Sequence, residues 1–482
     1  MPQTRTPLLD AIKGYHKEGV IPFDVPGHKH GKGVPELRKF LGDTVMQVDV
    51  NSMKCLDNLG NPTGVIAESE ALLADMYNAD KAFFLVNGTS AGVQAMIMSL
   101  CSPGDKLILP RNAHKSATNG LIMSGARPIY VQPEFHEAYG IALGVEVESI
   151  KKAIFHNPDA KAVFLINPTY YGSASDLKEI VKYAHSKGMA VLVDEAHGAH
   201  LHFHRDLPMS AMEAGADMAA VSLHKTGGSL TQSSALLMKG HRVSDKYIRK
   251  IINLNQTTSA SYLLMASLDV ARKNLATRGE QMLESVLGHC RKARNDINQI
   301  PGFYAFGREL EDKAGTHAFD ETKLVVNVSG LGLTGFRVYD ILRDEYGIQM
   351  ELGDTGNILA IVSLGDCDKS LGALVSALKD ISAKHYFEKK VKQVARKPHE
   401  LELSISPRDA FYAKKEVVDL KAASGRISGE SVMAYPPGIP VVTPGELITD
   451  EVINYLEFLI AEETMLTDMD DVNLQTIKVI KA

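Results

Sequence analysis

Residues 190–228 read AVLVDEAHGAHLHFHRDLPMSAMEAGADMAAVSLHKTGG, and the architecture of the chain can be worked out from this segment. It contains two short apolar runs, 190–193 and 218–222, with a segment of helical character at 209–214 between them. Apolar runs of this length without alternating polar positions are typical of strands that are buried on both faces of a sheet. The segment therefore predicts a β-α-β unit within an α/β domain.

The same alternation extends over residues 80–240. Five more apolar runs, rich in Val, Ile, Leu and Phe, predict strands at 82–86, 106–109, 128–131, 162–166 and 234–238. Segments with helical periodicity lie between them, at 90–100, 113–124 and 175–187. Strands that are joined by helices pair in parallel, because a parallel pair needs a long crossover connection. We expect a mostly parallel seven-stranded sheet that is covered by helices on both faces.

A smaller α+β unit is expected after the sheet domain. Residues 263–298 have apolar side chains at helical spacing and predict one or two long helices. Further on, the pattern predicts strands at 323–328, 348–351 and 358–362 and helices at 335–346 and 369–385. The chain is thus expected to comprise an N-terminal segment (1–60), a large domain (61–295), a small domain (296–395) and a C-terminal subdomain (396–482).

The composition excludes several classes of protein. The 482 residues are 45% hydrophobic and 23% charged, which is ordinary for a packed protein. Lys and Arg number 52 against 58 Asp and Glu, a net charge of −6, so there is no basic excess to attract nucleic acid or anionic lipid. The four cysteines are isolated, and no apolar stretch predicts a membrane span or a secretory signal. We expect a cytoplasmic protein that binds neither nucleic acid nor membrane.

Residues directly after predicted strands are the first candidates for a ligand site, because the crevice of a parallel sheet lies beyond the carboxyl ends of its strands. Gly88-Thr89-Ser90 follows one strand and begins a helix. Backbone N–H groups, hydroxyls and the helix dipole at such a junction suit a phosphate group, although the same residues could be an ordinary helix cap. His114 follows another strand, where its imidazole could cover a planar ring or simply begin a helix.

Asp194 and Lys225 follow two further strands. Asp194 ends the run 190–193, where a buried carboxylate needs a cationic or hydrogen-bonding partner. Lys225 lies beside Gly227-Gly228, and a partly desolvated amine at this place would be nucleophilic, which makes it a candidate Schiff-base lysine. We expect the two groups to face each other across one crevice. The alternatives are a structural cap or ion pair for Asp194 and a surface lysine for Lys225.

Two other patterns in this region are rejected. His197, His200, His202 and His204 form a cluster of the kind that binds zinc or nickel, but no Cys or acidic ligand motif accompanies them. Residues 194–197 spell DEAH, the tetrad of a helicase family. Such an ATPase needs G-x-x-x-x-G-K-[ST], and at Gly31-Lys32 the required first glycine is Pro26 and the required Ser or Thr is Gly33. We predict neither a metal site nor a helicase.

Taken together, the phosphate-type turn, the histidine, the aspartate and the lysine resemble the fold-type I pyridoxal-phosphate enzymes, whose large domain is aspartate aminotransferase-like. Eight ordered motifs, which span nearly the whole chain, resemble more closely the bacterial ornithine/lysine/arginine decarboxylase family. They are DVPGHK (24–29), LDNL (56–59), FLVNGTS (84–90), RNAHKS (111–116), DEAHG (194–198), SLHK (222–225), TTS (257–259) and YPPGIP (435–440).

The resemblance implies a role for each matching residue. Lys225 would form the Schiff base with pyridoxal 5'-phosphate, Asp194 would pair with the pyridine nitrogen, and His114 would stack on the ring. Lys225 or His224 would return a proton to the substrate Cα. The phosphate end and the pocket wall would be formed by Thr89, Ser90, Ala91, His197, Ser222 and His224, with Ser259 reaching across from a second subunit. Glu351 and Asp57 are the acidic candidates for the distal cation of the substrate.

The resemblance also implies the reaction and the assembly. The chain looks like the short form of the family, without the N-terminal wing, and most like the biosynthetic arginine decarboxylases of Gram-positive bacteria. We therefore expect conversion of L-arginine to agmatine and CO2 in polyamine biosynthesis, ahead of lysine and then ornithine decarboxylation. A homodimer with shared active sites, or a dimer of dimers, is expected, with residues 1–60 contributing. The alternatives are an aminotransferase or lyase of the same fold, or an inactive regulator of a decarboxylase.

Overall fold

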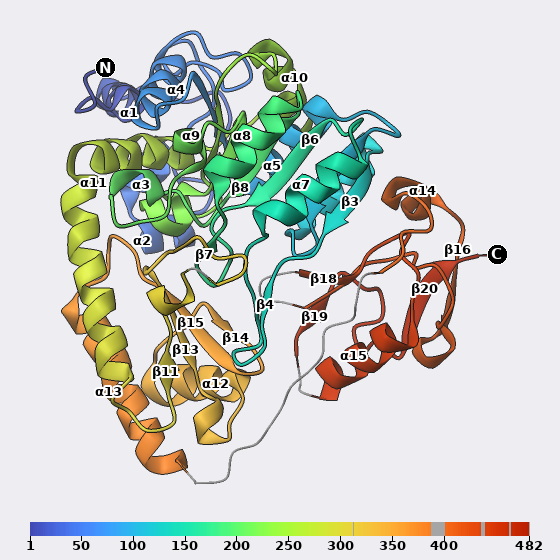
Figure 1. The fold of residues 1–482 in the computed structure, drawn as a ribbon. Helices are drawn as coiled ribbons and strands as arrows, with labels where there is room; N and C mark the ends of the chain where they lie inside the picture. Colours follow the sequence, from blue (N-terminus) through green and yellow to red (C-terminus); the bar gives the residue numbers. More distant parts are fainter. Residues whose placement is uncertain (312, 387–400, 435–438, 462–463, 482) are drawn as a thin grey trace.

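A seven-stranded sheet forms the centre of the large domain (Figure 1). The computed structural model describes residues 1–311, 313–386, 401–434, 439–461 and 464–481. The sheet has the order β1 (Lys81–Leu85), β10 (Ser234–Met238), β9 (Met218–Val221), β8 (Ala190–Glu195), β6 (Ala162–Ile166), β2 (Lys106–Pro110) and β3 (Arg127–Val131). All seven strands predicted from the apolar runs are confirmed, with ends that shift by one or two residues.

Strand directions bring the residues that follow the predicted strands to one edge of this sheet. β9, β8, β6, β2 and β3 are parallel, whereas β10 is antiparallel to both β9 and β1. Ser234, the first residue of β10, pairs with Leu85 at the end of β1, and Ala235 pairs with Val221 at the end of β9. The start of β10 and the carboxyl ends of β1 and of the parallel strands therefore meet at the same edge.

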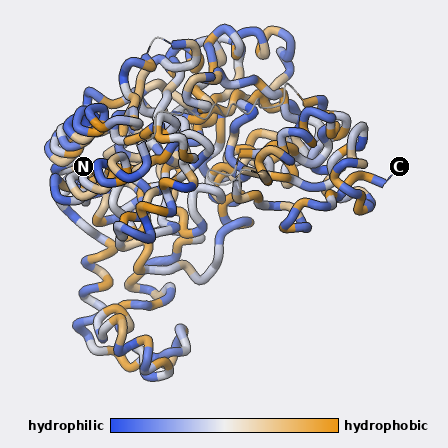
Figure 2. The backbone as a smooth tube through the Cα atoms, turned by 90° about the horizontal axis from the view of Figure 1, so that it is seen from below, coloured by the Kyte–Doolittle hydropathy of each residue, from blue (hydrophilic) through white to orange (hydrophobic). Residues whose placement is uncertain are grey.

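Helices cover both faces of the sheet, each over its own hydrophobic core. One core contains residues of α5 (Gly88–Leu100), α6 (Lys115–Ser124) and α10 (Asp245–Asn255). The other contains residues of α7 (Val147–His156), α8 (Leu177–Ser186), α9 (Ala211–Ala214) and the N-terminal helices α1 (Pro7–Glu18) and α4 (Val65–Met76). Hydrophobic segments accordingly run through the middle of the molecule (Figure 2). All six residues of β8 are buried, including the four of the apolar run 190–193, whose burial was predicted.

A single helix, α11 (Tyr262–Ile297), leads from the large domain to a smaller antiparallel sheet (Figure 1). This sheet has the order β11 (Tyr304–Ala305), β13 (Lys323–Asn327), β15 (Asn357–Ile361) and β14 (Leu352–Gly353). Its core includes residues of α12 (Gly335–Tyr346) and α13 (Asp368–His385). The strand predicted at 348–351 is wrong, because pairing with β15 begins only at Leu352. The other predicted strands and helices of this unit are confirmed.

The C-terminal unit has small sheets of its own. β16 (Lys415–Asp419) pairs with β20 (Thr476–Ile480), and β17 (Val432–Ala434) lies between β18 (Ile439–Val442) and β19 (Leu466–Thr467). Its helices are α14 (Pro407–Tyr412) and α15 (Asp450–Ala461). Residues 435–438 of the YPPGIP motif lie outside the described residues. The predicted domain boundaries stay predictions.

The remaining elements are short. The α-helices and strands among them are α2 (Pro35–Leu41), α3 (Asp43–Val48), β4 (Phe135–His136), β5 (Ile141–Ala142), β7 (Ser173–Ala174) and β12 (Ala318–Phe319). Across the part of the chain that the structure describes, no helix is both long enough and apolar enough to cross a membrane.

Candidate active site

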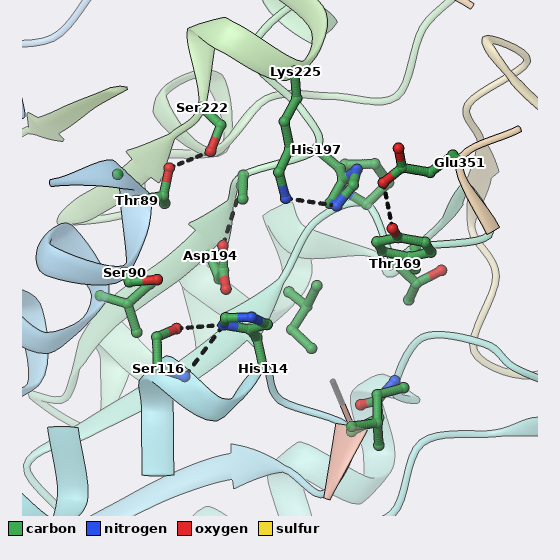
Figure 3. Close-up of a pocket in the computed structure, with 18 of the residues that line it drawn as sticks. Thr89, Ser90, His114, Ser116, Thr169, Asp194, His197, Ser222, Lys225 and Glu351 are labelled. Atoms are coloured by element: carbon green, nitrogen blue, oxygen red, sulfur yellow. Dashed lines mark hydrogen bonds between the residues drawn. The ribbon is translucent and has the colours of Figure 1, made fainter. Parts of the chain in front are cut away.

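A pocket of about 370 Å³ lies at the carboxyl edge of the large sheet (Figure 3). Strand ends of the large domain, the residue before β14 and the first residue of β18 line it. The predicted site residues among the lining are Thr89, Ser90, His114, Asp194, His197, Ser222, His224, Lys225 and Glu351. The fold thus gathers side chains that are far apart in the sequence into one cavity.

Asp194 lies near the end of the buried strand β8. It is 7% exposed, and its Oδ1 accepts a hydrogen bond from the Ala196 N–H at 3.1 Å. Burial raises the pKa of Asp194, while the Lys225 ammonium and the Ala196 N–H oppose that change. A carboxylate in this position is stabilised by a cation in the pocket, because an unpaired buried charge is costly.

Lys225 lies on a short π-helical turn, η2 (Leu223–Gly227), directly after β9. Gly228, with φ of 87°, ends the turn in the left-handed conformation that suits glycine. Burial lowers the pKa of Lys225, while Asp194 and Glu351 raise it. Figure 3 shows Lys225 and Asp194 projecting toward the same cavity, as the sequence predicted. Their catalytic roles stay predictions.

His197 contacts the Lys225 amine directly. Its Nε2 lies 2.9 Å from Lys225 Nζ, and its ring packs edge-on against Tyr170 with the ring centroids 4.5 Å apart. Burial and the Lys225 ammonium hold the pKa of His197 well below its usual value, so its imidazole is neutral at physiological pH. A neutral imidazole can exchange a hydrogen bond with the amine without adding a second positive charge.

Two further histidines line the pocket in the neutral form. His114 is the N-cap of α6, where its Nδ1 accepts a hydrogen bond from the Ser116 N–H at 3.2 Å. Burial, together with the nearby Lys225, lowers the pKa of His114 to about 4. His224 Nδ1 lies 2.9 Å from the Ser233 carbonyl oxygen, and burial lowers its pKa. Because the carbonyl can only accept, the Nδ1 of His224 carries its proton and Nε2 is the acceptor.

Hydroxyl groups gather where α5 begins. Thr89 Oγ1 is hydrogen-bonded to Ser222 Oγ. It also donates a hydrogen bond to Ser234 Oγ at 3.1 Å. Gly88 precedes them with φ of 70°, a conformation that favours glycine, and its N–H donates to the Gln232 carbonyl at 3.0 Å. Hydroxyls beside the first turn of a helix form an environment that suits an anionic group.

Another part of the pocket wall is formed by Glu351 and Tyr170, which are hydrogen-bonded to each other. Glu351 is exposed just before β14, and Tyr170 Oη donates to its Oε1 at 2.5 Å. Tyr170 follows β6 in the Asn167–Gly172 turn, so the strand-end rule pointed to its segment but not to the residue itself. Thr231 and Gln232, which precede β10, also line the pocket. No sequence signal indicated them, because they precede a strand that runs against its neighbours.

Three predicted site residues do not line this pocket within the described chain. Ala91 is buried inside α5. The carboxylate of Asp57 accepts hydrogen bonds from backbone N–H groups, including those of Thr63 and Gly64 at 3.0 and 2.7 Å. Ser259 is exposed. The roles predicted for these residues, including the reach of Ser259 into a second subunit, stay predictions.

The histidines after β8 have separate partners. His200 lies 3.3 Å from Asp320, His204 lies 2.8 Å from Glu284, and His202 lies 3.5 Å from Glu213. Among the residues that the structure describes, no group of three or more His, Cys, Asp or Glu side chains could hold a metal ion.

A buried ion pair joins the C-terminal unit to the pocket. Arg111 donates to Glu446 at 2.7 Å, and the two side chains are 6% and 0% exposed. Arg111 also donates to the carbonyl oxygens of Pro440 and Val441 at 3.2 and 3.3 Å. Ile439, the residue before Pro440, lines the pocket. The C-terminal unit therefore supplies part of the pocket wall, and Arg111 holds it there.

We expect Arg111→Met to lower the free energy of unfolding by about 3 kcal/mol or more, because it leaves the Glu446 carboxylate buried without its cation. Urea unfolding of the full chain measures this change. Lys106→Met is the matched control on β2, since Lys106 pairs with Asp159 at the surface, where the side chains are 34% and 64% exposed. The control should change stability by less than about 1 kcal/mol. Equal losses in the two variants would contradict the assignment.

Comparisons with known proteins agree with this architecture. The family model described as "Orn/Lys/Arg decarboxylase, major domain" matches residues 6–370, and the model described as "Orn/Lys/Arg decarboxylase, C-terminal domain" matches residues 386–467. Among solved structures, a lysine decarboxylase of Francisella novicida has a TM-score of 0.88 at 22% identity, covering 99% of this chain and 81% of that one. The expected α/β fold of the fold-type I enzymes is confirmed.

Relatives with higher identity extend over the whole length. An arginine decarboxylase of Bacillus anthracis is 46% identical over 482 residues, which are 99% of this chain and 98% of that protein. An arginine decarboxylase of Bacillus subtilis is 46% identical over 485 residues, with 100% and 99% coverage. The resemblance seen in the eight sequence motifs is therefore confirmed, and the chain belongs to the Orn/Lys/Arg decarboxylase family.

Proposed function

We propose that this protein removes CO2 from L-arginine to form agmatine, with pyridoxal 5'-phosphate as its cofactor. The observation that carries the proposal is the meeting of the Lys225 amine and the Asp194 carboxylate in one pocket at the sheet edge. The choice of arginine is supported by the two Bacillus relatives at 46% identity, which are named arginine decarboxylases. The product would feed polyamine biosynthesis, and the enzyme would work in the cytoplasm.

The residues of the pocket fit this cofactor. Pyridoxal phosphate offers an anionic phosphate, a basic ring nitrogen, a flat ring and an aldehyde. The hydroxyls of Thr89, Ser222 and Ser234 at the start of α5 would hold the phosphate, together with Ser90 and the adjoining backbone. Asp194, a buried carboxylate with a cation nearby, would pair with the protonated ring nitrogen.

The remaining groups complete the fit. His114, a neutral imidazole in the wall, would cover the ring, and the Lys225 amine would bind the aldehyde carbon. When bound, pyridoxal phosphate would supply an electron sink for the pair of electrons left on the substrate Cα as CO2 departs. The chain's own groups then determine how the substrate and its protons are placed.

Asp194 would keep a proton on the ring nitrogen through a charge-assisted hydrogen bond. The Lys225 ammonium, whose Nζ lies 2.9 Å from His197 Nε2, would return a proton to Cα after CO2 has left. His224, the other candidate, would first have to take up a proton on Nε2, because its Nδ1 proton is held by the Ser233 carbonyl. The strand ends, with the half-buried Tyr170 and Ile439, would shield that carbon from water on their side of the pocket.

Glu351 would bind the guanidinium group of arginine, since its carboxylate lines the same cavity as Lys225 and lies beside His197 in Figure 3. We expect Glu351→Gln to raise the KM for arginine about tenfold with a smaller change in kcat, because a charged hydrogen bond contributes ~1.5 to 3 kcal/mol. Steady-state kinetics of the holoenzyme measure both constants. Glu345→Gln is the control, since Glu345 is half-exposed on α12 and pairs with Lys384. A loss confined to kcat would contradict this role.

The same residues would also serve an aminotransferase or another lyase, and they would also serve a decarboxylase that acts on lysine or ornithine. Identifying the products therefore distinguishes these reactions. The test is CO2 release from arginine, lysine and ornithine side by side, with chromatography of the products. We expect agmatine from arginine as the main reaction. A keto acid, or release of CO2 mainly from lysine or ornithine, would overturn the proposal, and absence of any reaction in the cofactor-loaded chain would favour an inactive regulator.

We also propose that the enzyme is a homodimer or a dimer of dimers, with Ser259 serving the partner's site. Supporting this, the N-terminal segment exposes several large apolar side chains, among them Ile21, Phe23 and Phe40 at 77%, 94% and 85%. Apolar side chains gathered on one surface segment usually mark a place that another protein covers.

A further inference from the structure

A buried cation from the small sheet lies behind the active-site wall. Lys323 is the first residue of β13 and is fully buried. Its Nζ donates to the carbonyl oxygen of His197 at 3.3 Å and pairs with Asp320 Oδ2 at 3.2 Å. A lysine ammonium loses its hydration when it is buried, so its place depends on these two acceptors. One of them belongs to the residue whose ring contacts Lys225.

Asp320, the anion of this pair, is held in place by Thr322 and His200. Asp320 Oδ1 accepts from the Thr322 hydroxyl at 2.7 Å and from the Thr322 N–H at 3.0 Å, and it lies 3.3 Å from His200 Nε2. Burial alone would raise the pKa of Asp320, but Lys323 and His200 hold it far below its usual value. Asp320 is therefore ionised over the whole physiological range, and it keeps the Lys323 ammonium beneath the His197 carbonyl.

The His197 loop has little room to move. A Cβ on Gly198 would lie 2.6 Å from Glu195 Cγ and 2.9 Å from the Asn167 carbonyl oxygen, so the loop passes very close to its neighbours. Within the described residues, His197 Nδ1 is buried without a hydrogen-bond partner. The ring is thus placed by its backbone, by Tyr170 and by the Lys225 amine.

We propose that Lys323 is a positioning residue of the active site, whose ammonium, fixed by Asp320, holds the His197 loop and thereby the ring that orients the Lys225 amine. The inference rests on the proposed role of Lys225 and adds a contribution from the small domain. The Lys323 charge also favours the uncharged form of Lys225, since burial lowers the pKa of Lys225 and Lys323 lowers it further. An uncharged amine is the form that attacks an aldehyde.

Lys323 is not the only charged group that acts on the Lys225 amine. The titratable groups that face Lys225 from the surrounding elements are Asp194, Glu351, Lys323, His197, His114 and His224. Asp194 and Glu351 favour the ammonium form and Lys323 opposes it. Removing the Lys323 charge should therefore raise the pKa of Lys225.

The test uses the full-length chain freed of cofactor. Lys225 is acetylated over a range of pH, and its labelling is followed by mass spectrometry. Lys323→Met removes the cation, and the double variant Lys323→Met with Asp320→Asn removes both charges, so that no unpaired buried charge is left. In Lys323→Met we expect the half-labelling pH of Lys225 to rise by about one unit, roughly tenfold less free amine at a given acidic pH. In the double variant we expect a smaller rise, because the Asp320 charge, which acts on the neighbouring His197 with the opposite sign to Lys323, is lost as well.

The control is Arg272→Met with Asp269→Asn, which removes another fully buried ion pair, one that does not line the pocket. It should lower the melting temperature without changing the labelling profile of Lys225. An unchanged profile in a folded double variant would overturn the proposal, because a merely structural ion pair would leave the amine as it was. A different result would show that the proposed role of Lys225 is wrong: in that case a Lys225→Ala chain would keep its turnover.

Discussion

Replacing Lys225 by alanine should reduce decarboxylation at least ~10³-fold and abolish the visible absorbance of the covalently bound cofactor. The side chain would supply both the amine that binds the cofactor aldehyde and a candidate proton donor to Cα, and loss of either function alone costs orders of magnitude. Absorbance spectra of the purified variant and CO2 release under saturating arginine measure the two effects independently.

A lysine at the other end of the sheet provides the control for this variant. Lys161 directly precedes β6, is 49% exposed and pairs with Asp105 at 3.7 Å. Lys161→Ala should keep both the spectrum and the turnover, because the amino ends of the strands are remote from the pocket. If Lys225→Ala retained steady-state turnover, the assignment of the cofactor lysine would be wrong.

Asp194→Asn should lower kcat about 100-fold or more while the cofactor remains covalently bound. An amide cannot stabilise a positive ring nitrogen as a carboxylate does, and the lost charge-assisted bond is worth ~1.5 to 3 kcal/mol, more where burial excludes water. Each 1.36 kcal/mol corresponds to about a tenfold change in rate. Steady-state kinetics together with the absorbance spectrum separate this defect from loss of cofactor.

The adjacent carboxyl is a matched control. Burial raises the pKa of Glu195 to about 8, so the group is mostly protonated at pH 7. Its Oε1 accepts from the Ala211 N–H at 2.7 Å and from Asn167 at 3.2 Å, and it does not line the pocket. Glu195→Gln, which is also neutral, should stay close to the parent in rate. Wild-type turnover in Asp194→Asn would refute the role given to Asp194.

Much of the sheet edge that lines the pocket could be predicted because strand positions and strand ends are local properties. The apolar runs at 162–166 and 190–193 are buried on both faces, so their length and composition alone identify strands. Side chains that follow parallel strands share an edge by topology, which is why Asp194 and Lys225 meet where they were expected. The strand predicted at 348–351 failed because a strand also requires a partner, and pairing there begins at Leu352.

The order of residues thus determined by itself the seven strands, the edge of the sheet at which the pocket lies, and the histidine, aspartate and lysine presented there. Burial pattern and strand direction allow this because they depend on near neighbours in the chain. Only the tertiary structure brought Lys323 beneath His197, Tyr170 against Glu351, and Ile439 into the wall through Arg111 and Glu446. These contacts join separate units, and their free energy arises from packing between elements that no local periodicity encodes.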